Sequence, residues 1–67
     1  TDFYIDIPIE LLPAEFHLYS VDGKLLLKEE INQTRQQIST ENLRPGTYSY
    51  RIKRTNYYES GKIILIQ

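Results

Sequence analysis

Residues 15–26 read EFHLYSVDGKLL, and this stretch has the pattern of a β-hairpin. Apolar and polar side chains alternate ahead of the turn, so that Leu18 is expected in a core. His17 lies on the opposite parity and is expected to be at the surface or half-buried. The pair Asp22-Gly23 predicts a two-residue type I′ turn, because both central residues of that turn need a positive φ.

The strand pattern continues on both sides of this hairpin. Runs of β-forming residues are separated by Gly, Pro and Asn, which mark turns, and no window has the apolar spacing of a helix. Six short runs at regular spacing predict an all-β fold, an immunoglobulin- or fibronectin-like antiparallel β-sandwich. The predicted strands cover 3–7, 15–21, 24–31, 37–39, 46–54 and 57–67.

The connections of this sandwich can also be assigned. Residues 32–36 are polar and predict a loop, and a corner after the fourth strand is expected to place Leu43 in the core. Pro45 and Gly46 suit the two central positions of a type II turn. Tyr48 follows as a core residue, and its hydroxyl is expected to form a bond like that of a tyrosine corner near this turn.

Composition excludes several classes of function. The chain has 67 residues, which is enough for one small domain. It has no cysteine, so disulfides, cysteine-based zinc sites and thiol nucleophiles are excluded. Its single histidine has no clustered carboxylates in the sequence, and we expect no enzyme activity, metal or cofactor. A net charge of −1 gives no electrostatic case for nucleic acid.

Charged and aromatic side chains offer weaker candidates. Arg51 and Lys53 share a strand face and predict a small basic patch that could dock an acidic partner. Glu29 and Glu30 are adjacent, so they face opposite ways and cannot act together on one substrate. Exposed tyrosines favour an alternative function, a fibronectin-like or carbohydrate-binding accessory module. These tyrosines are Tyr4, Tyr19, Tyr57 and Tyr58.

The last run of the chain is apolar on both parities. It is interpreted as an ordinary core strand or as a signal strand that pairs with a receptor by β-augmentation. The turn at Asp22, Gly23 and Lys24 is a second candidate for recognition. A frayed terminal strand would favour a strand-exchanged homodimer. The strand residues predicted for recognition are Gly61, Lys62, Ile63, Ile64, Leu65, Ile66 and Gln67.

Three motifs in this order resemble the type A C-terminal sorting domain of the type IX (Por) secretion system. The hairpin stretch 16–26 is similar to the family's LYDxxGKxV motif, although Ser20 stands where the family usually has Asp. Ile38 through Tyr48 resembles its I…L..GxY corner, and 61–67 resembles its closing GKIVI strand. The family usually opens with a YPNP stretch that this chain lacks, which suggests that 1–67 is cut from the C-terminus of a larger cargo protein.

The resemblance implies a seven-stranded immunoglobulin-like sandwich without catalytic activity. Its partners would be an N-terminal cargo domain, the outer-membrane secretion apparatus of Bacteroidetes-type bacteria and a sortase-like processing peptidase. The domain would pass through the periplasm, direct the cargo to the cell surface or the medium, and be cleaved for surface attachment.

Overall fold

The computed structural model describes residues 2–66, and these residues form an all-β fold. The all-β prediction is therefore confirmed, and the alternating runs in the sequence become strands. The elements are β1 (Asp2–Asp6), a 3₁₀ turn η1 (Ile9–Leu11), β2 (Ala14–Tyr19), β3 (Leu25–Ile31), β4 (Arg35–Ser39), β5 (Gly46–Arg54) and β6 (Tyr57–Leu65).

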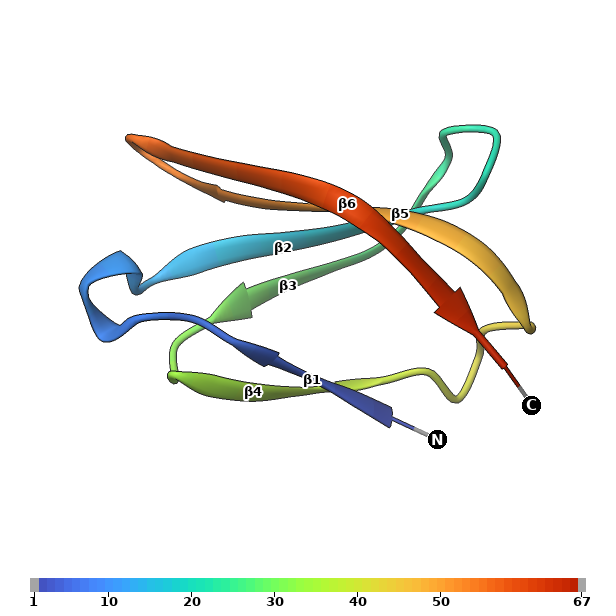
Figure 1. Cartoon of the computed structure of the whole chain (residues 1–67), viewed down its shortest axis with the longest axis horizontal. Coiled ribbons are helices and arrows are strands. Elements are labelled where there is room, and N and C mark those ends of the chain that lie inside the picture. The colour runs from blue at the N-terminus through green and yellow to red at the C-terminus, as the bar shows by residue number, and fades with distance from the viewer. Residues whose placement is uncertain (1, 67) are drawn as a thin grey trace.

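The six strands form two antiparallel sheets that face each other as a sandwich (Figure 1). The larger sheet has the order β3-β2-β5-β6, and the smaller one pairs β1 with β4. The chain crosses from the small sheet to the large one through η1, and Pro8 caps this turn. Proline cannot donate to a strand ladder, which is why a crossover stands here rather than a longer β1.

Four side chains form the centre of the core between the sheets. Phe16 and Leu18 of β2 are 1% exposed, and Ile31 and Ile38 are fully buried. The ring of Phe3 in β1 meets Phe16 edge-on at 6.0 Å between centroids, which joins the two sheets. The remaining buried apolar residues of the cluster are Ile5, Ile7, Ala14, Tyr48 and Ile52, and Leu43 packs against it in a half-buried position.

The smaller sheet covers the larger one incompletely. An apolar groove of about 320 Å³ lies beside β1, between that strand and the inner face of β5 and β6. Phe3, Tyr50 and Ile63 are among its lining residues. As a consequence, Ile63 and Leu65 on the inner face of β6 are half-buried, whereas the inner residues of β2 are buried completely.

The turn between β2 and β3 corrects the predicted type I′ geometry. Among the described residues no non-glycine residue has a positive φ, so Asp22 cannot occupy a type I′ position. The Gly23 N–H instead donates to the carbonyl of Ser20 at 3.0 Å, and Gly23 alone has φ of 90°. The Ser20 N–H donates to the Lys24 carbonyl at 2.9 Å. This pattern is a three-residue loop with glycine in the left-handed position.

The corner before β5 differs from its prediction in one respect. Pro45 and Gly46 are not the central residues of a type II turn, because Gly46 already pairs with Leu65 as the first residue of β5. The φ of Gly46 is 153°, far from the value of about 80° that a type II turn needs. The hydroxyl of Tyr48 donates to the carbonyl of Arg44 and ties the corner to β5. Tyr48 therefore makes the backbone contact that defines a tyrosine corner.

The start of β4 and the pairing of β2 with β3 also differ from what was expected. The predicted loop over 32–36 ends early, because Arg35 and Gln36 already pair with β1 as part of β4. The register of β2 against β3 shifts at Leu18/Tyr19, so that Tyr19 stands opposite Leu25. A shift of one residue moves side chains to the other face. Leu25 is therefore exposed, whereas Ile31, which shares its parity in the sequence, is buried.

Candidate functional site

The strand β6 forms one edge of the larger sheet (Figure 1). Within residues 2–66 it pairs only with β5, over a continuous register from Tyr57 opposite Arg54 to Leu65 opposite Gly46. Ile64 on its outer face is 68% exposed, and Ile66 just beyond it is 81% exposed. Large apolar side chains on an unpaired strand edge are a template for pairing with another chain. Gln67 of the predicted recognition set lies outside the described residues.

A glutamate held by two tyrosines fixes the register of β6 on its inner face. The hydroxyl of Tyr50 donates to Oε2 of Glu59 at 3.1 Å, and that of Tyr57 donates to Oε1 at 2.5 Å. Tyr50 stands directly opposite Gly61 in the ladder. A Cβ atom at Gly61 would lie 2.7 Å from Cε2 of the Tyr50 ring. The glycine therefore leaves the space that lets this ring lie across β6 and reach Glu59.

Both tyrosine hydroxyls are harder to ionise as a result. The pKa of Tyr50 lies above its ordinary value because burial disfavours the phenolate, and the bond to Glu59 and its charge add to this effect. The pKa of Tyr57 is raised mainly by its hydrogen bond to Glu59. We call these two hydrogen bonds to Glu59 the Glu59 clamp; a protonated phenol donates each of them.

The hairpin tip carries the second set of predicted recognition residues. Asp22, Gly23 and Lys24 are all exposed, as is Val21, which is 87% accessible. The Ser20 hydroxyl donates to Asp22 and also accepts the Lys24 N–H at 3.1 Å. The bond from Ser20 is the main reason that the pKa of Asp22 is lowered. A tip braced in this way presents its charged side chains in a defined geometry.

The outer face of the larger sheet holds the remaining polar candidates. Nδ1 of His17 lies 3.0 Å from the Tyr19 hydroxyl, and Nε2 lies 3.2 Å from a carboxylate oxygen of Glu15. His17 is half-buried, with 12% of its side chain exposed, and it lies on the predicted face. The guanidinium of Arg51 lies 5.2 Å from the Tyr19 ring centroid. These contacts order Tyr19 and Arg51 beside each other.

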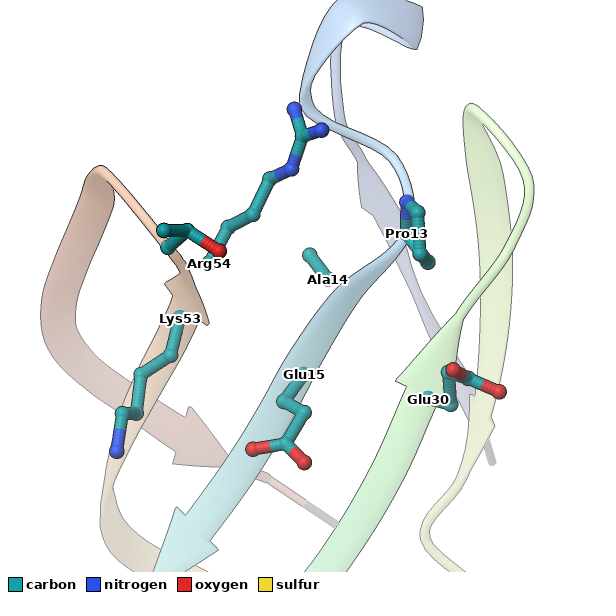
Figure 2. A pocket seen from close by; sticks show the side chains of 7 residues that line it. Pro13, Ala14, Glu15, Glu30, Lys53 and Arg54 are labelled. Atoms are coloured by element: carbon teal, nitrogen blue, oxygen red, sulfur yellow. The ribbon is translucent and has the colours of Figure 1, made fainter.

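A wide hollow of about 530 Å³ lies where β2 and β5 meet the crossover (Figure 2). Its charged lining residues are Glu15, Glu30, Lys53 and Arg54. The Arg54 side chain extends toward the crossover, where it donates to the carbonyl of Glu10 (Figure 2). Glu15 already faces His17 and also Lys28, whose Nζ lies at 3.9 Å. Glu15 and Arg54 are therefore already engaged by contacts within the chain.

The four tyrosines that were predicted to be exposed do not form one continuous aromatic surface. Tyr4 belongs to β1 in the smaller sheet, where the Arg35 guanidinium lies 4.3 Å from its ring centroid. Tyr57 points inward to Glu59, whereas Tyr58, its neighbour, is 58% exposed. The sheet order separates Tyr4 from the other tyrosines, whereas Tyr19 and Tyr58 share the outer face of the larger sheet.

Two further features bear on the class of site. Among residues 2–66 there is no group of three or more His, Asp or Glu side chains that could hold a metal ion. The same part of the chain contains no helix that is long and apolar enough to cross a membrane.

The sandwich fold and the open edge of β6 place the chain in the class of β-sandwich binding domains. The family model of the secretion system C-terminal sorting domain matches residues 1–67, and the chain belongs to this family. No curated protein and no solved structure matches it. The domain is a C-terminal signal for type IX secretion, which implies interaction with the secretion machinery and export of an N-terminal cargo to the cell surface or the medium.

Proposed function

We propose that the recognition element of this secretion signal is residues 61–67, which are the C-terminal part of β6 and the residues that follow it. The observation that carries this proposal is the free edge of β6 with Ile64 68% exposed beside it. An extended segment of the secretion machinery adds to this edge by main-chain hydrogen bonds, and pockets for alternate side chains give specificity. Ile64 is the side chain that enters such a pocket.

The other parts of the domain support this strand. The Glu59 clamp holds its register, so that the same side chains always face outward. The tip at Asp22, Gly23 and Lys24 makes a second contact with the machinery. Residues 1–67 act as one non-enzymatic domain at the C-terminus of the cargo, cross the periplasm with it, and are removed by a sortase-like peptidase for surface attachment. In isolation the same free edge favours pairing or strand exchange with a second copy.

A charge at the strand edge tests this function. Residues 1–67 are fused to a periplasmic fluorescent reporter in a bacterium with type IX secretion. Ile64→Lys is compared with Ile9→Lys, since Ile9 in η1 is similarly exposed at 73%. An edge lysine blocks strand pairing, so we expect the exported fraction to fall about tenfold for Ile64→Lys and to stay near that of the parent for Ile9→Lys.

The outcomes separate the parts of this function. Equal export of both variants would exclude the edge of β6 as the recognition element. Retention of the parent fusion in the periplasm would exclude a sufficient signal within 1–67. The mass of the exported reporter shows whether the domain is removed, and a strain without the secretion machinery is the control.

A further inference from the structure

The outer face of the larger sheet contains a second hollow, of about 400 Å³, over β2, β5 and β6. We call it the outer-face hollow. In the ladder, Tyr19 pairs with Ser49, which pairs with Lys62. Two residues further along β5, on the same face, Arg51 pairs with Ser60. The lining side chains used below are Tyr19, Ser49, Arg51, Tyr58, Ser60 and Lys62.

The charge of this hollow is unbalanced. Its lining residues include two cations, Arg51 and Lys62, and no carboxylate. The two cations occupy diagonal positions of one antiparallel pair, a spacing at which side chains interact. Among residues 2–66, the ion pairs are those of Glu15 and Asp6, and neither cation takes part in them. Like charges at this spacing repel each other and destabilise the free domain, and an anionic partner reduces this repulsion.

The hollow is also ordered before any partner arrives. The Tyr19 hydroxyl is bonded to His17, and the Arg51 guanidinium lies against the Tyr19 ring at 5.2 Å from its centroid. Tyr58 leaves 58% of its surface open at the other side. Tyrosine and arginine are enriched at protein interfaces and among their hot spots. Pre-ordered side chains lose less entropy when they bind.

The kind of partner follows from the position of the hollow. β5 is an inner strand whose backbone is already paired on both sides, so a partner can only contact side chains there. Tyr58 and Lys62 belong to β6, and the hollow therefore continues from the free edge of that strand. A partner strand added to β6 would extend this face and bring its own outward side chains next to Lys62.

We propose that the outer-face hollow docks a carboxylate-bearing protein surface of the secretion machinery, next to the strand that pairs with β6. This inference rests on the proposed function, because it takes β6 as the recognition element. Carboxylates of the partner pair with Arg51 and Lys62, and Tyr58 packs against the same partner surface. The electrostatic contact fixes which side of the partner strand faces outward and suppresses wrong partners.

Charge reversal on the reporter fusion tests the hollow. Arg51→Glu/Lys62→Glu is compared with Lys28→Glu/Arg44→Glu, which changes the net charge equally at exposed positions outside the hollow. We expect export to fall about tenfold or more for the first pair, because like charges then face each other at the interface. The exported fraction of the control pair should stay within about twofold of the parent, since exposed charges far from the interface contribute little. Equal effects of the two pairs would overturn the inference.

Milder variants keep the test valid if the reversed pair fails to fold. Arg51→Lys/Lys62→Arg preserves the charge and should be exported like the parent, whereas Arg51→Gln/Lys62→Gln should be exported less. Thermal unfolding of each isolated domain reports its folding. Normal export of a folded Gln pair would overturn the inference.

A photo-crosslinking residue at Tyr58 identifies the chemical class of the partner. The expected product contains peptides of a second protein, as identified by mass spectrometry, and is lost in the Gln pair. A product that carries a glycan or lipid adduct and no peptides of a second protein would overturn the protein docking surface. If the parent fusion and Ile64→Lys are both fully exported, the role of β6 as the recognition element is refuted but the secretion signal is not. If the parent fusion is not exported, the secretion signal itself is refuted.

Discussion

Adding one methyl group at Gly61 should reveal how the Tyr50 ring fixes β6. The new Cβ of Gly61→Ala would lie 2.7 Å from Cε2, 2.8 Å from the hydroxyl oxygen and 2.9 Å from Cζ of Tyr50. These distances are shorter than van der Waals contact, so the ring must move. Its motion is opposed by the stacking on Phe16, at 6.1 Å between centroids, and by the bond to Glu59.

The size of the effect can be worked out from two opposing contributions. Overpacking a well-filled site costs about 1–3 kcal/mol of unfolding free energy. Alanine in a strand interior recovers about 0.5–1 kcal/mol relative to glycine, because the unfolded chain loses freedom. The net result for Gly61→Ala is a destabilisation of up to about 2.5 kcal/mol.

A double-mutant cycle isolates the ring as the cause. Tyr50→Leu removes all three atoms that the new Cβ would meet. In that background we expect Gly61→Ala to stabilise the domain by about 0.5–1 kcal/mol, which reverses the sign of its effect. Urea unfolding of the four proteins 1–67 measures each free energy. The same effect of Gly61→Ala in both backgrounds would refute the contact, since the coupling energy would be zero.

Two further changes test the corner and the hairpin. Tyr48→Phe removes the hydrogen bond to the Arg44 carbonyl and should lower the free energy of unfolding by about 0.5–1.5 kcal/mol, where each kcal/mol lowers Tm by about 4–8 °C. The control Tyr4→Phe, at an exposed tyrosine, should leave Tm unchanged. Equal shifts in Tm for the two variants would contradict the corner bond. The pKa of Asp22 is lowered from about 3.8 by the Ser20 hydroxyl, so its contribution to stability is complete above that pH and is lost as pH falls through the folded-state value. Asp22→Asn should therefore lose less stability than the parent on acidification below about pH 4, as measured by thermal unfolding against pH, and parallel curves for the two proteins would argue against this linkage.

The strands were predictable because their signals are local. The alternation in β2 and β5 is a period of two residues that can be read without knowing any partner. The exposed Leu25 shows the limit of this reasoning. It shares the parity of the buried Ile31 in the sequence, but the register shift opposite Tyr19 turned it outward. A bulge inserts one residue into one strand, and only the pairing of two strands shows where.

The candidate site was predictable in part for the same reason. The last run of the chain was predicted to be a recognition strand because it has apolar residues on both parities. The Glu59 clamp was not predicted. The diagonal placement of Arg51 and Lys62 on neighbouring strands was not predicted either. Lys62 and Arg51 are separated in the sequence by the whole β5–β6 turn, and only the ladder register makes them diagonal neighbours. Counting residues from the turn at Thr55-Asn56 could have found this pair.

The sequence by itself determined where strands form, where the chain turns and to which family its ordered motifs belong. These are properties of residue type and short spacing, such as the alternation of Phe16 with His17 and the left-handed φ of Gly23. Tertiary structure alone decided which strands pair, which edge stays open and which side chains meet across the ladder. Backbone hydrogen bonds are alike for every strand, so the choice of partner depends on how side chains pack between the sheets. That packing leaves β6 at the edge and places Gly61 beneath the Tyr50 ring.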